Sequence, residues 1–229
     1  MTDARVSPVD VSTLQERVYQ ELRAALFQGR FAPGETLTIR TLAQAMGTSE
    51  MPVREALQRL TAEKVLQQIP GRSIQVTPVT HERHDELTRI RMSVEGLAAK
   101  LAAPRADALL ILQLKKFNFE MGEAAAAKDW LPALQRNQEF HFAIYRAAKS
   151  AQLFEIIESL WLRTGPFLAG AYRGPQKPEE MFLRGMQVHE RVIAALDRRD
   201  GKAAMQGIML DIKSANSWYR RYCDFAIAS

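Results

Sequence analysis

The sequence predicts a mainly α-helical chain in two parts, three short helices with a small β-hairpin followed by an all-helical bundle. Turn-forming residues divide residues 12–78 at short intervals, and a Pro-Gly turn near residue 70 separates two β-prone runs. Beyond residue 79, apolar residues recur at helical spacing without a credible strand. We therefore expect a flexible N-terminus over 1–11, one domain over 12–78 and a second over 79–229, a division that the 229-residue length allows.

The composition excludes several classes of protein. Hydrophobic residues make up 47% of the chain and charged residues 25%, which are ordinary globular values and disfavour a disordered or fibrous chain. The single cysteine, Cys223, rules out a disulfide framework and a cysteine-rich zinc finger. There is no apolar run long enough to span a membrane and no signal-peptide core at the N-terminus. These features predict a cytoplasmic protein without a membrane partner.

The net charge of +5 is spread unevenly along the chain. Residues 1–80 contain nine Arg and Lys against eight Asp and Glu, a net of +1, and the remaining +4 lies in the second part. Bulk charge is therefore a weak argument for a nucleic-acid partner. If the first part binds DNA, the placement of a few cations must decide it.

Turn and cap residues define three helices in the first part. A capping box formed by Thr13 and Glu16 begins the first helix, and Pro33-Gly34 provides the turn before the second. The second helix is expected over 39–46. Ser49 is an N-cap residue type that begins the third. A hairpin then follows around Pro70-Gly71.

Three short helices followed by a hairpin form a winged helix-turn-helix pattern. In this arrangement the third helix enters the major groove of DNA with its N-terminal residues toward the base edges. Arg54 lies one turn into that helix, Arg40 opens the preceding helix, and Arg72 lies at the tip of the hairpin. Arginine suits bidentate contact with guanine, although a single arginine on a helix is usually a solvated or ion-paired surface group.

Apolar stripes predict a bundle of six or more helices in the second part. The first stripe would face the core of the bundle and consists of Ile90, Val94, Leu97 and Leu101. Gly165-Pro166 is expected to end the fourth helix of the bundle, and Asp200-Gly201 is expected to separate the last two. The remaining helices are expected over 109–127, 130–148, 153–164, 182–196 and 204–219.

Polar residues on these apolar stripes are the candidate functional residues. Asn137 and His141 are four residues apart and share a face, and His189 lies on the apolar stripe of another helix. Two core-facing histidines can converge on a metal ion or on the carboxylate of a small ligand. The alternative is that each is a neutral core histidine bonded to a backbone carbonyl. His81 and His84 begin a helix near the domain junction and are expected to be surface or capping residues.

Arg91 has two open interpretations. It can form an i,i+4 ion pair with Glu95, or it can lie at the mouth of a pocket and bind an acidic ligand. Catalysis finds little support, because the chain has no phosphate-binding glycine loop, no nucleophile elbow and no Cys-His or paired-carboxylate arrangement on one inward face. The sequence therefore predicts a protein that is not an enzyme.

Two stretches of the chain resemble a known family. The pattern G-x-x-x-P-G over 29–34, followed by G-x-S-x-x-P-V-R-E-A-L over 47–57, resembles the N-terminal domain of GntR-type bacterial transcription regulators. The second part is similar to the helical ligand-binding domain of the FadR subfamily, the FCD domain. Its landmarks are matched by Arg91–Glu95, Asn137–His141 and His189–Leu196.

The resemblance implies a set of DNA contacts. They are Arg40, Thr48, Ser49, Glu50, Met51, Arg54, Gly71 and Arg72. Two positions depart from the family pattern. Glu50 stands where the family commonly has Arg, and its carboxylate cannot bind phosphate but can accept from cytosine N4. Ser73 stands where a wing glycine is frequent.

The resemblance also implies a ligand pocket in the bundle. Metal-binding FCD domains use an Asp four residues before a first His, followed by two further histidines. Here Asn137 takes the Asp position, His141 and His189 match, and Ile208 aligns with the last histidine. This incomplete set predicts a metal-free pocket or one that holds Zn²⁺ or Ni²⁺ weakly. We expect His141, His189, Asn137 and Arg91 to hold an organic acid directly.

These observations predict a homodimeric, ligand-responsive regulator of transcription. It would bind a palindromic double-stranded operator as a repressor of a small-carboxylate catabolic or transport operon, and an organic acid effector would release it. Two alternatives remain from the sequence. One is a helical-bundle metal-dependent enzyme with an accessory N-terminal domain, and the other is a DNA-binding protein whose bundle is purely structural.

Overall fold

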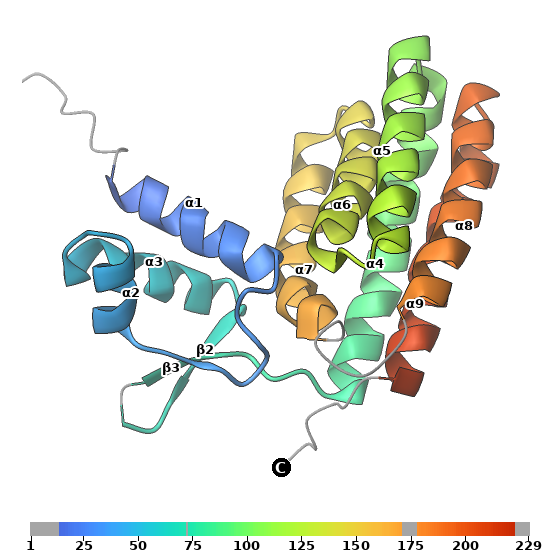
Figure 1. The fold of residues 1–229 in the computed structure, drawn as a ribbon. Coiled ribbons are helices and arrows are strands. Elements are labelled where there is room, and N and C mark those ends of the chain that lie inside the picture. Colours follow the sequence, from blue (N-terminus) through green and yellow to red (C-terminus); the bar gives the residue numbers. More distant parts are fainter. Residues whose placement is uncertain (1–13, 72, 171–177, 223–229) are drawn as a thin grey trace, which may run out of the picture.

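The computed structural model describes residues 14–71, 73–170 and 178–222 and has the predicted fold class (Figure 1). The segment 1–11, Arg72 and Cys223 lie outside these residues. The first part contains α1 (Leu14–Phe27), β1 (Thr36–Leu37), α2 (Ile39–Ala45), α3 (Glu50–Ala62), β2 (Leu66–Ile69) and β3 (Ser73–Val76). The bundle contains α4 (His81–Ala102), a short 3-10 helix (Ala103–Arg105), α5 (Ala108–Ala126), α6 (Trp130–Ala147), α7 (Ala151–Gly170), α8 (Glu179–Asp197) and α9 (Gly201–Tyr222).

The predicted hairpin is the larger part of a three-stranded antiparallel sheet with the order β1-β3-β2. Within the hairpin, Leu66 pairs with Val76 and Ile69 pairs with Ser73. The sequence does not predict β1, because two residues are too few to show an alternating pattern. Gly34 brings this strand to the sheet, since its φ of +81° is a conformation that glycine adopts readily and its N–H donates to Val76 O at 2.9 Å.

The helix-turn-helix follows its local signals. Gly47 has a φ of +61° just beyond α2, where it reverses the chain, and Ser49 is the N-cap residue of α3. The inner face of α3 is buried against α1, and its core residues are Val53, Ala56, Leu57 and Leu60. Because this inner face is held by packing, the N-terminal end of α3 and its opposite face stay exposed.

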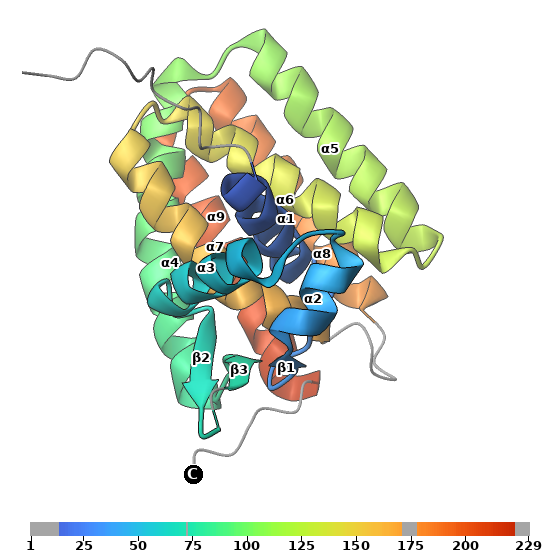
Figure 2. The same ribbon diagram turned by 90° about the vertical axis from the view of Figure 1, so that its left-hand side faces the viewer.

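The helices of the bundle pack mainly as α4 on α9, α5 on α6 and α8 on α9. Figure 2 shows α4 and α7 along one edge of the bundle and α5 along the opposite edge. None of the described helices is both long enough and apolar enough to cross a membrane.

Only half of the stripe beginning at Ile90 faces the core as predicted, because Val94 and Leu101 pack against it but the other two residues do not. Ile90 and Leu97 are 41% and 45% exposed, whereas the small residues Ala98 and Ala99 are fully buried. Close packing explains this rotation of α4. A Cβ at Gly96 would lie 3.1 Å from Met209 Cγ of α9, so the helix presents its smallest residues where α9 approaches most closely.

The prediction that Gly165-Pro166 ends its helix is also wrong, because α7 continues to Gly170. The helix is supported here by α1, since a Cβ at Gly165 would lie 3.0 Å from Phe27 Cα. This contact with α1 supports the helix although Pro166 cannot donate a backbone hydrogen bond.

Helix α7 joins the two parts of the molecule. Leu162 is 1% exposed and belongs to the apolar core of the first part, whereas the adjacent Trp161 belongs to the core of the bundle. Polar contacts reinforce this junction. Arg163 Nε donates to Glu63 O at 3.1 Å, and an Arg23–Glu158 ion pair of 3.4 Å links α1 to α7.

Candidate functional site

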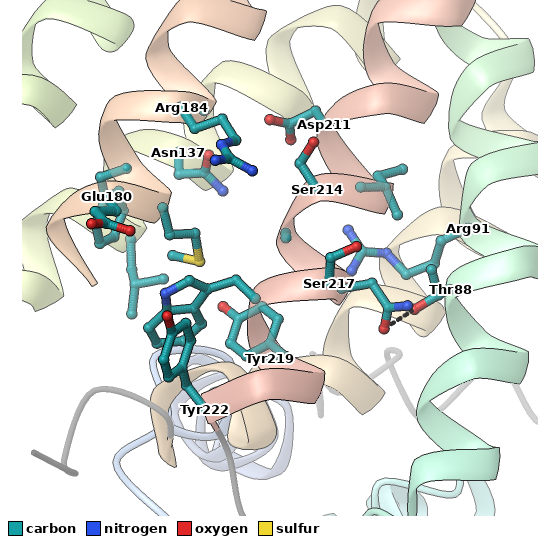
Figure 3. A pocket seen from close by; sticks show the side chains of 18 of the residues that line it. Thr88, Arg91, Asn137, Glu180, Arg184, Asp211, Ser214, Ser217, Tyr219 and Tyr222 are labelled. Carbon is teal, nitrogen blue, oxygen red and sulfur yellow. Dashed lines mark hydrogen bonds between the residues drawn. The ribbon is translucent and has the colours of Figure 1, made fainter. Parts of the chain in front are cut away.

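A cavity of about 330 Å³ opens inside the bundle, between α4, α6, α8 and α9 (Figure 3). This volume suits a small organic molecule. Figure 3 shows Arg91 entering from α4 and Asp211 from α9, with Asn137 and Arg184 across the cavity from Arg91. Its remaining polar lining includes His84, Thr88, His141, Glu180, Ser214, Asn216 and Ser217, and its aromatic lining includes Trp161, Phe182, Trp218, Tyr219 and Tyr222.

Two histidines and one aspartate converge beside this cavity, which His141 and Asp211 line and His189 does not. His141 Nε2 lies 3.2 Å from Asp211 Oδ2, and His189 Nε2 lies 3.7 Å from Asp211 Oδ1. Each residue offers one ligand atom, and the three atoms lie within 4.8 Å of one another. Both histidines are buried, at 1% and 0% exposure. The sequence places them on inward stripes, and the fold brings them together.

The hydrogen bonds around His141 determine where its proton lies. Tyr145 Oη donates to Glu95 Oε2 at 2.5 Å and lies 3.0 Å from His141 Nδ1. A hydroxyl has one hydrogen, so the contact with His141 requires Nδ1 to donate and Tyr145 to accept. Burial and the neighbouring Glu95 raise the pKa of Tyr145 well above its ordinary value, which keeps the hydroxyl protonated. In the neutral ring, Nε2 of His141 therefore presents a lone pair to Asp211.

A second set of hydrogen bonds fixes His189 in the same way. Asn118 Nδ2 donates to Met186 O at 3.3 Å, which orients the amide so that its oxygen lies 3.1 Å from His189 Nδ1. Nδ1 must donate to that oxygen, and Nε2 is left with a lone pair and without a hydrogen-bond partner among the described residues. Burial lowers the pKa of His189, which favours the neutral ring.

This arrangement of donor atoms fits a transition-metal ion. Burial acts to raise the pKa of Asp211, but the adjacent His141 and His189 outweigh it and hold the pKa well below its ordinary value, so the carboxylate is ionised. An ionised carboxylate that faces the Nε2 atoms of two imidazoles needs a cation between the three groups. That cation is either a proton on one of these nitrogens or a metal ion. Two imidazoles and a carboxylate suit Zn²⁺ or Ni²⁺, and histidines that bind metal usually donate their other N–H to an outer partner, as both do here.

Arg91 forms the predicted ion pair and also lines the cavity, so binding of an acidic ligand stays a prediction. Arg91 Nε donates to Glu95 Oε1 at 2.6 Å, and the same guanidinium lines the cavity. It also lies over the ring of Trp161, 4.6 Å from the centroid. Glu95 is fully buried and accepts hydrogen bonds from both Arg91 and Tyr145. One carboxylate therefore positions the guanidinium of Arg91 and the hydroxyl that contacts His141.

Some site residues were not predicted from the sequence, and one prediction is corrected. Ile208 was aligned with the last metal ligand, but it is fully buried in the core, and the carboxylate beside the histidines belongs to Asp211, three residues later. The only sequence signal for Asp211 is a carboxylate directly before the core residue Ile212. Asn118 carries no signal, because its partner His189 is 71 residues away.

His84 is also corrected, because it is neither a surface nor a capping residue. Its exposure is 5%, and it lines the cavity. The N-cap of α4 is Thr80, whose Oγ1 accepts from Arg83 N at 3.3 Å. The sequence pattern failed here because α9 covers the first turns of α4, where the ring of Tyr219 lies 5.8 Å from that of His84.

The predicted DNA contacts lie on an exposed surface of the first part. Arg40 is exposed at the start of α2, and Met51 is 60% exposed at the start of α3. Arg54 lies 3.8 Å from Glu50 in an exposed i,i+4 ion pair, so this departure from the family pattern partly neutralises the recognition helix. Gly71 has a φ of +89° in the hairpin turn, and Arg72 lies outside the described residues. Ser49 and Thr48 precede Glu50 in the turn, exposed and half-buried respectively.

The fold and these two surfaces define the class of the protein. A winged helix-turn-helix with an exposed third helix, joined to a helical bundle that contains a polar cavity, is the architecture of a DNA-binding regulator with a second, helical domain. Residues 14–76 match the bacterial regulatory proteins of the gntR family, and residues 86–213 match the FCD domain. The chain belongs to the GntR family of bacterial transcription regulators.

Relatives with known names agree with this assignment. The transcriptional regulator McbR of Escherichia coli K12 is 30% identical over 82% of this chain and 84% of its own length. The solved structure of E. coli McbR/YncC has a TM-score of 0.85 and covers 92% of this chain and 99% of its own. A probable D-xylose utilization operon repressor of Paenarthrobacter nicotinovorans is 28% identical over 74% of both chains. These relatives are regulators and not enzymes, as the sequence predicts.

Burial of His84 predicts a measurable dependence of stability on pH. Burial lowers the pKa of His84 from 6.5 to about 4, so the unfolded chain binds this proton more tightly. The stability that neutral His84 contributes is complete above about pH 6.5 and is lost as the pH falls toward about 4, with a slope of up to about 1.4 kcal/mol per pH unit. Urea unfolding at pH 7.5 and 5.0 should show a smaller loss in His84→Gln than in the wild type. Equal losses would contradict the buried position.

Proposed function

We propose that the protein is a cytoplasmic, homodimeric repressor that binds a palindromic operator through α3 and is released when a small organic acid enters the cavity. The proposal assigns residues 12–78 to DNA binding and 79–229 to sensing and dimerisation. The observation that carries it is the convergence of three metal-ligand atoms, from His141, His189 and Asp211, the first and last of which line the same cavity as Arg91. The buried Nε2 of His189, which has no hydrogen-bond partner among the described residues, supports a bound ligand or ion, because buried polar groups are normally paired.

The effector site would consist of a metal ion together with Arg91 and Asn137 of the cavity lining. His141, His189 and Asp211 would hold Zn²⁺ or Ni²⁺, and three protein ligands leave coordination positions open to a carboxylate oxygen. Arg91 and Asn137 line the same cavity and suit the remaining oxygens of an acid. Asp211 supports a resident metal more strongly than the sequence suggested, and the acid would then bind the metal as well as the side chains.

Trp161 offers a direct route from the cavity to the DNA-binding part. Its ring lies 5.4 Å from that of His141 and under the guanidinium of Arg91. The ring of Phe27, the last residue of α1, also stacks on it at 6.2 Å. An acid that moves Arg91 or His141 would shift Trp161 and with it α1. Because α1 packs on α3, this would alter the packing of the recognition helix. The response can be only as large as the difference in affinity of the acid for the two arrangements.

DNA binding should depend on Arg54. In gel-shift titrations with DNA from the region upstream of the gene, Arg54→Ala should weaken binding by about 5- to 150-fold, the range for loss of one bidentate base contact. The matched control is Arg105→Ala, which removes an exposed arginine of the bundle and should bind as the wild type does. Wild-type affinity should fall steeply with salt. An unchanged affinity of Arg54→Ala would remove α3 from the proposed interface.

Metal binding should depend on the hydroxyl behind His141. Tyr145→Phe removes the acceptor that fixes the Nδ1 proton, and it should weaken Zn²⁺ or Ni²⁺ binding by about 10- to 100-fold in calorimetric titrations of chelator-treated protein. The control Tyr222→Phe changes another tyrosine of the cavity without this contact and should keep the wild-type affinity. Absence of stoichiometric metal binding by the wild type would overturn the metal site.

Coupling between the two parts should depend on Phe27. Acetate, succinate and citrate can be screened as probes by thermal unfolding of the metal-loaded protein, because an acid at 100 times its Kd stabilises the fold by about 2.7 kcal/mol. An acid that stabilises the wild type should also release it from DNA. Phe27→Ala should keep the stabilisation and lose most of the release, since the contact with Trp161 is removed. Full release of Phe27→Ala would contradict this route, and no stabilisation by any acid would favour a structural bundle.

A further inference from the structure

A second, much smaller space lies where the end of α1 meets α6 and α7. Its volume is about 20 Å³, and it is lined by Phe27 and Gln28 from the first part together with Trp161 and Gly165 of α7. Figure 1 shows the C-terminal end of α1 beside α7. The small space therefore lies at the junction of the two parts of the molecule.

Two side chains that line this small space each carry a buried polar atom without a partner. Trp161 Nε1 and Gln28 Oε1 are buried, and neither forms a hydrogen bond with any described residue. The indole N–H can only donate and the amide oxygen can only accept, so the two atoms are complementary. They do not bond to each other directly. Because buried polar groups are normally paired, a group that bridges these two atoms is expected.

The fold holds both residues in place. Gln28 N donates to Ala24 O at 2.9 Å, which continues the turn of α1 through this residue. The ring of Trp161 is 4% exposed and is held by the guanidinium of Arg91 and by the ring of Phe27. A molecule that bridges the two polar atoms therefore costs less than a movement of the indole ring away from its contacts.

The walls of the small space select a small and neutral occupant. Their polar groups are the indole of Trp161 and the side-chain amides of Gln28, Gln135, Asn137 and Gln138, and none of the described residues that line the space is charged. An ion would find no opposite charge there. The volume of about 20 Å³ exceeds the roughly 10–15 Å³ that one water molecule needs and is too small for an organic ligand. A water molecule can accept from the indole N–H and donate to the amide oxygen at once.

We propose that a water molecule binds in this small space, accepts from Trp161 Nε1 and donates to Gln28 Oε1, and so links the bundle to the end of α1. Asn137 and Trp161 line both the small space and the cavity of the bundle. An acid that displaces either side chain would break this water bridge and loosen the end of α1. This role in the response rests on the proposed function, whereas the water site does not.

The test is whether the full-length, acid-free protein holds a water molecule at Trp161. In nuclear magnetic resonance spectra of isotope-labelled protein, the indole proton of Trp161 should show cross-relaxation with water, with the sign that marks a long-lived bound molecule. Trp161→Phe identifies this resonance among the three tryptophans of the chain. Because no acid is present, a hydroxyl group of an effector cannot produce the signal.

Gln28→Met tests the other end of the water bridge. It removes the acceptor oxygen and keeps a side chain of similar length, so the water signal at Trp161 should be lost and the indole resonance should shift. The folding equilibrium constant should fall by about 5-fold or more, because a buried N–H is left unpaired. The matched control is Gln20→Met, which changes an exposed glutamine of α1 that bonds to Glu16 and does not line the small space. It should keep the wild-type signals.

The outcomes separate the water site from the function. A wild-type indole proton without a bound-water signal would overturn the site, and so would a signal that Gln28→Met leaves unchanged. With an acid that releases the wild type from DNA, Gln28→Met should keep the thermal stabilisation and reduce the effect of the acid on operator affinity by about 5-fold or more. Undiminished release by this variant would overturn the role in the response but not the site. If no acid releases the wild type, the proposed effector response fails, and the spectra still decide the water site.

Discussion

The buried carboxylate of Glu95 is the constraint on which most of the bundle depends. An ionised group without solvent needs opposite charge and hydrogen bonds, and Arg91 and Tyr145 supply them. Satisfying Glu95 sets the hydroxyl of Tyr145, which in turn sets the proton of His141 and leaves its other nitrogen open toward Asp211. The same requirement fixes the rotation of α4. With Glu95 turned inward, Ile90 and Leu97 face outward, while Val94 and Leu101 stay packed against the core.

The DNA-binding part has little excess positive charge. Residues 1–80 have a net charge of +1, and Glu50 partly neutralises Arg54 on the recognition helix. A protein with a strong positive field binds any duplex, whereas we expect this one to depend on a few well-placed contacts and so on the DNA sequence. Such a protein is sensitive to small displacements of α3. That sensitivity suits the proposed sensor, in which the ring of Trp161 lies between His141 of the cavity and Phe27 of α1.

Local signals in the sequence predict most of the fold and only part of the site. Caps, turns and periodicity place the three helices, the hairpin and the bundle, because they act within a few residues. They do not predict which face of α4 is buried, since that depends on the close approach of α9 and on Glu95. They also fail at Pro166, where packing on α1 supports the helix. The inward histidines are visible in the sequence, but Asp211 and Asn118 are not, because nothing local distinguishes a carboxylate or amide whose partner lies on another helix.

Leu162 of α7 packs in the core of the first part, and this limits how the two parts can be exchanged between proteins. The connection between them, at residues 77–80, looks in the sequence like a natural point of exchange. A hybrid cut there would join the winged helix to a foreign bundle and would lose Leu162, which fills the first core from the far side of that boundary. The hybrid would start with a cavity under α1 and an exposed Phe27. A designer who wants to join this winged helix to another bundle therefore has to transfer the matching segment of α7 as well.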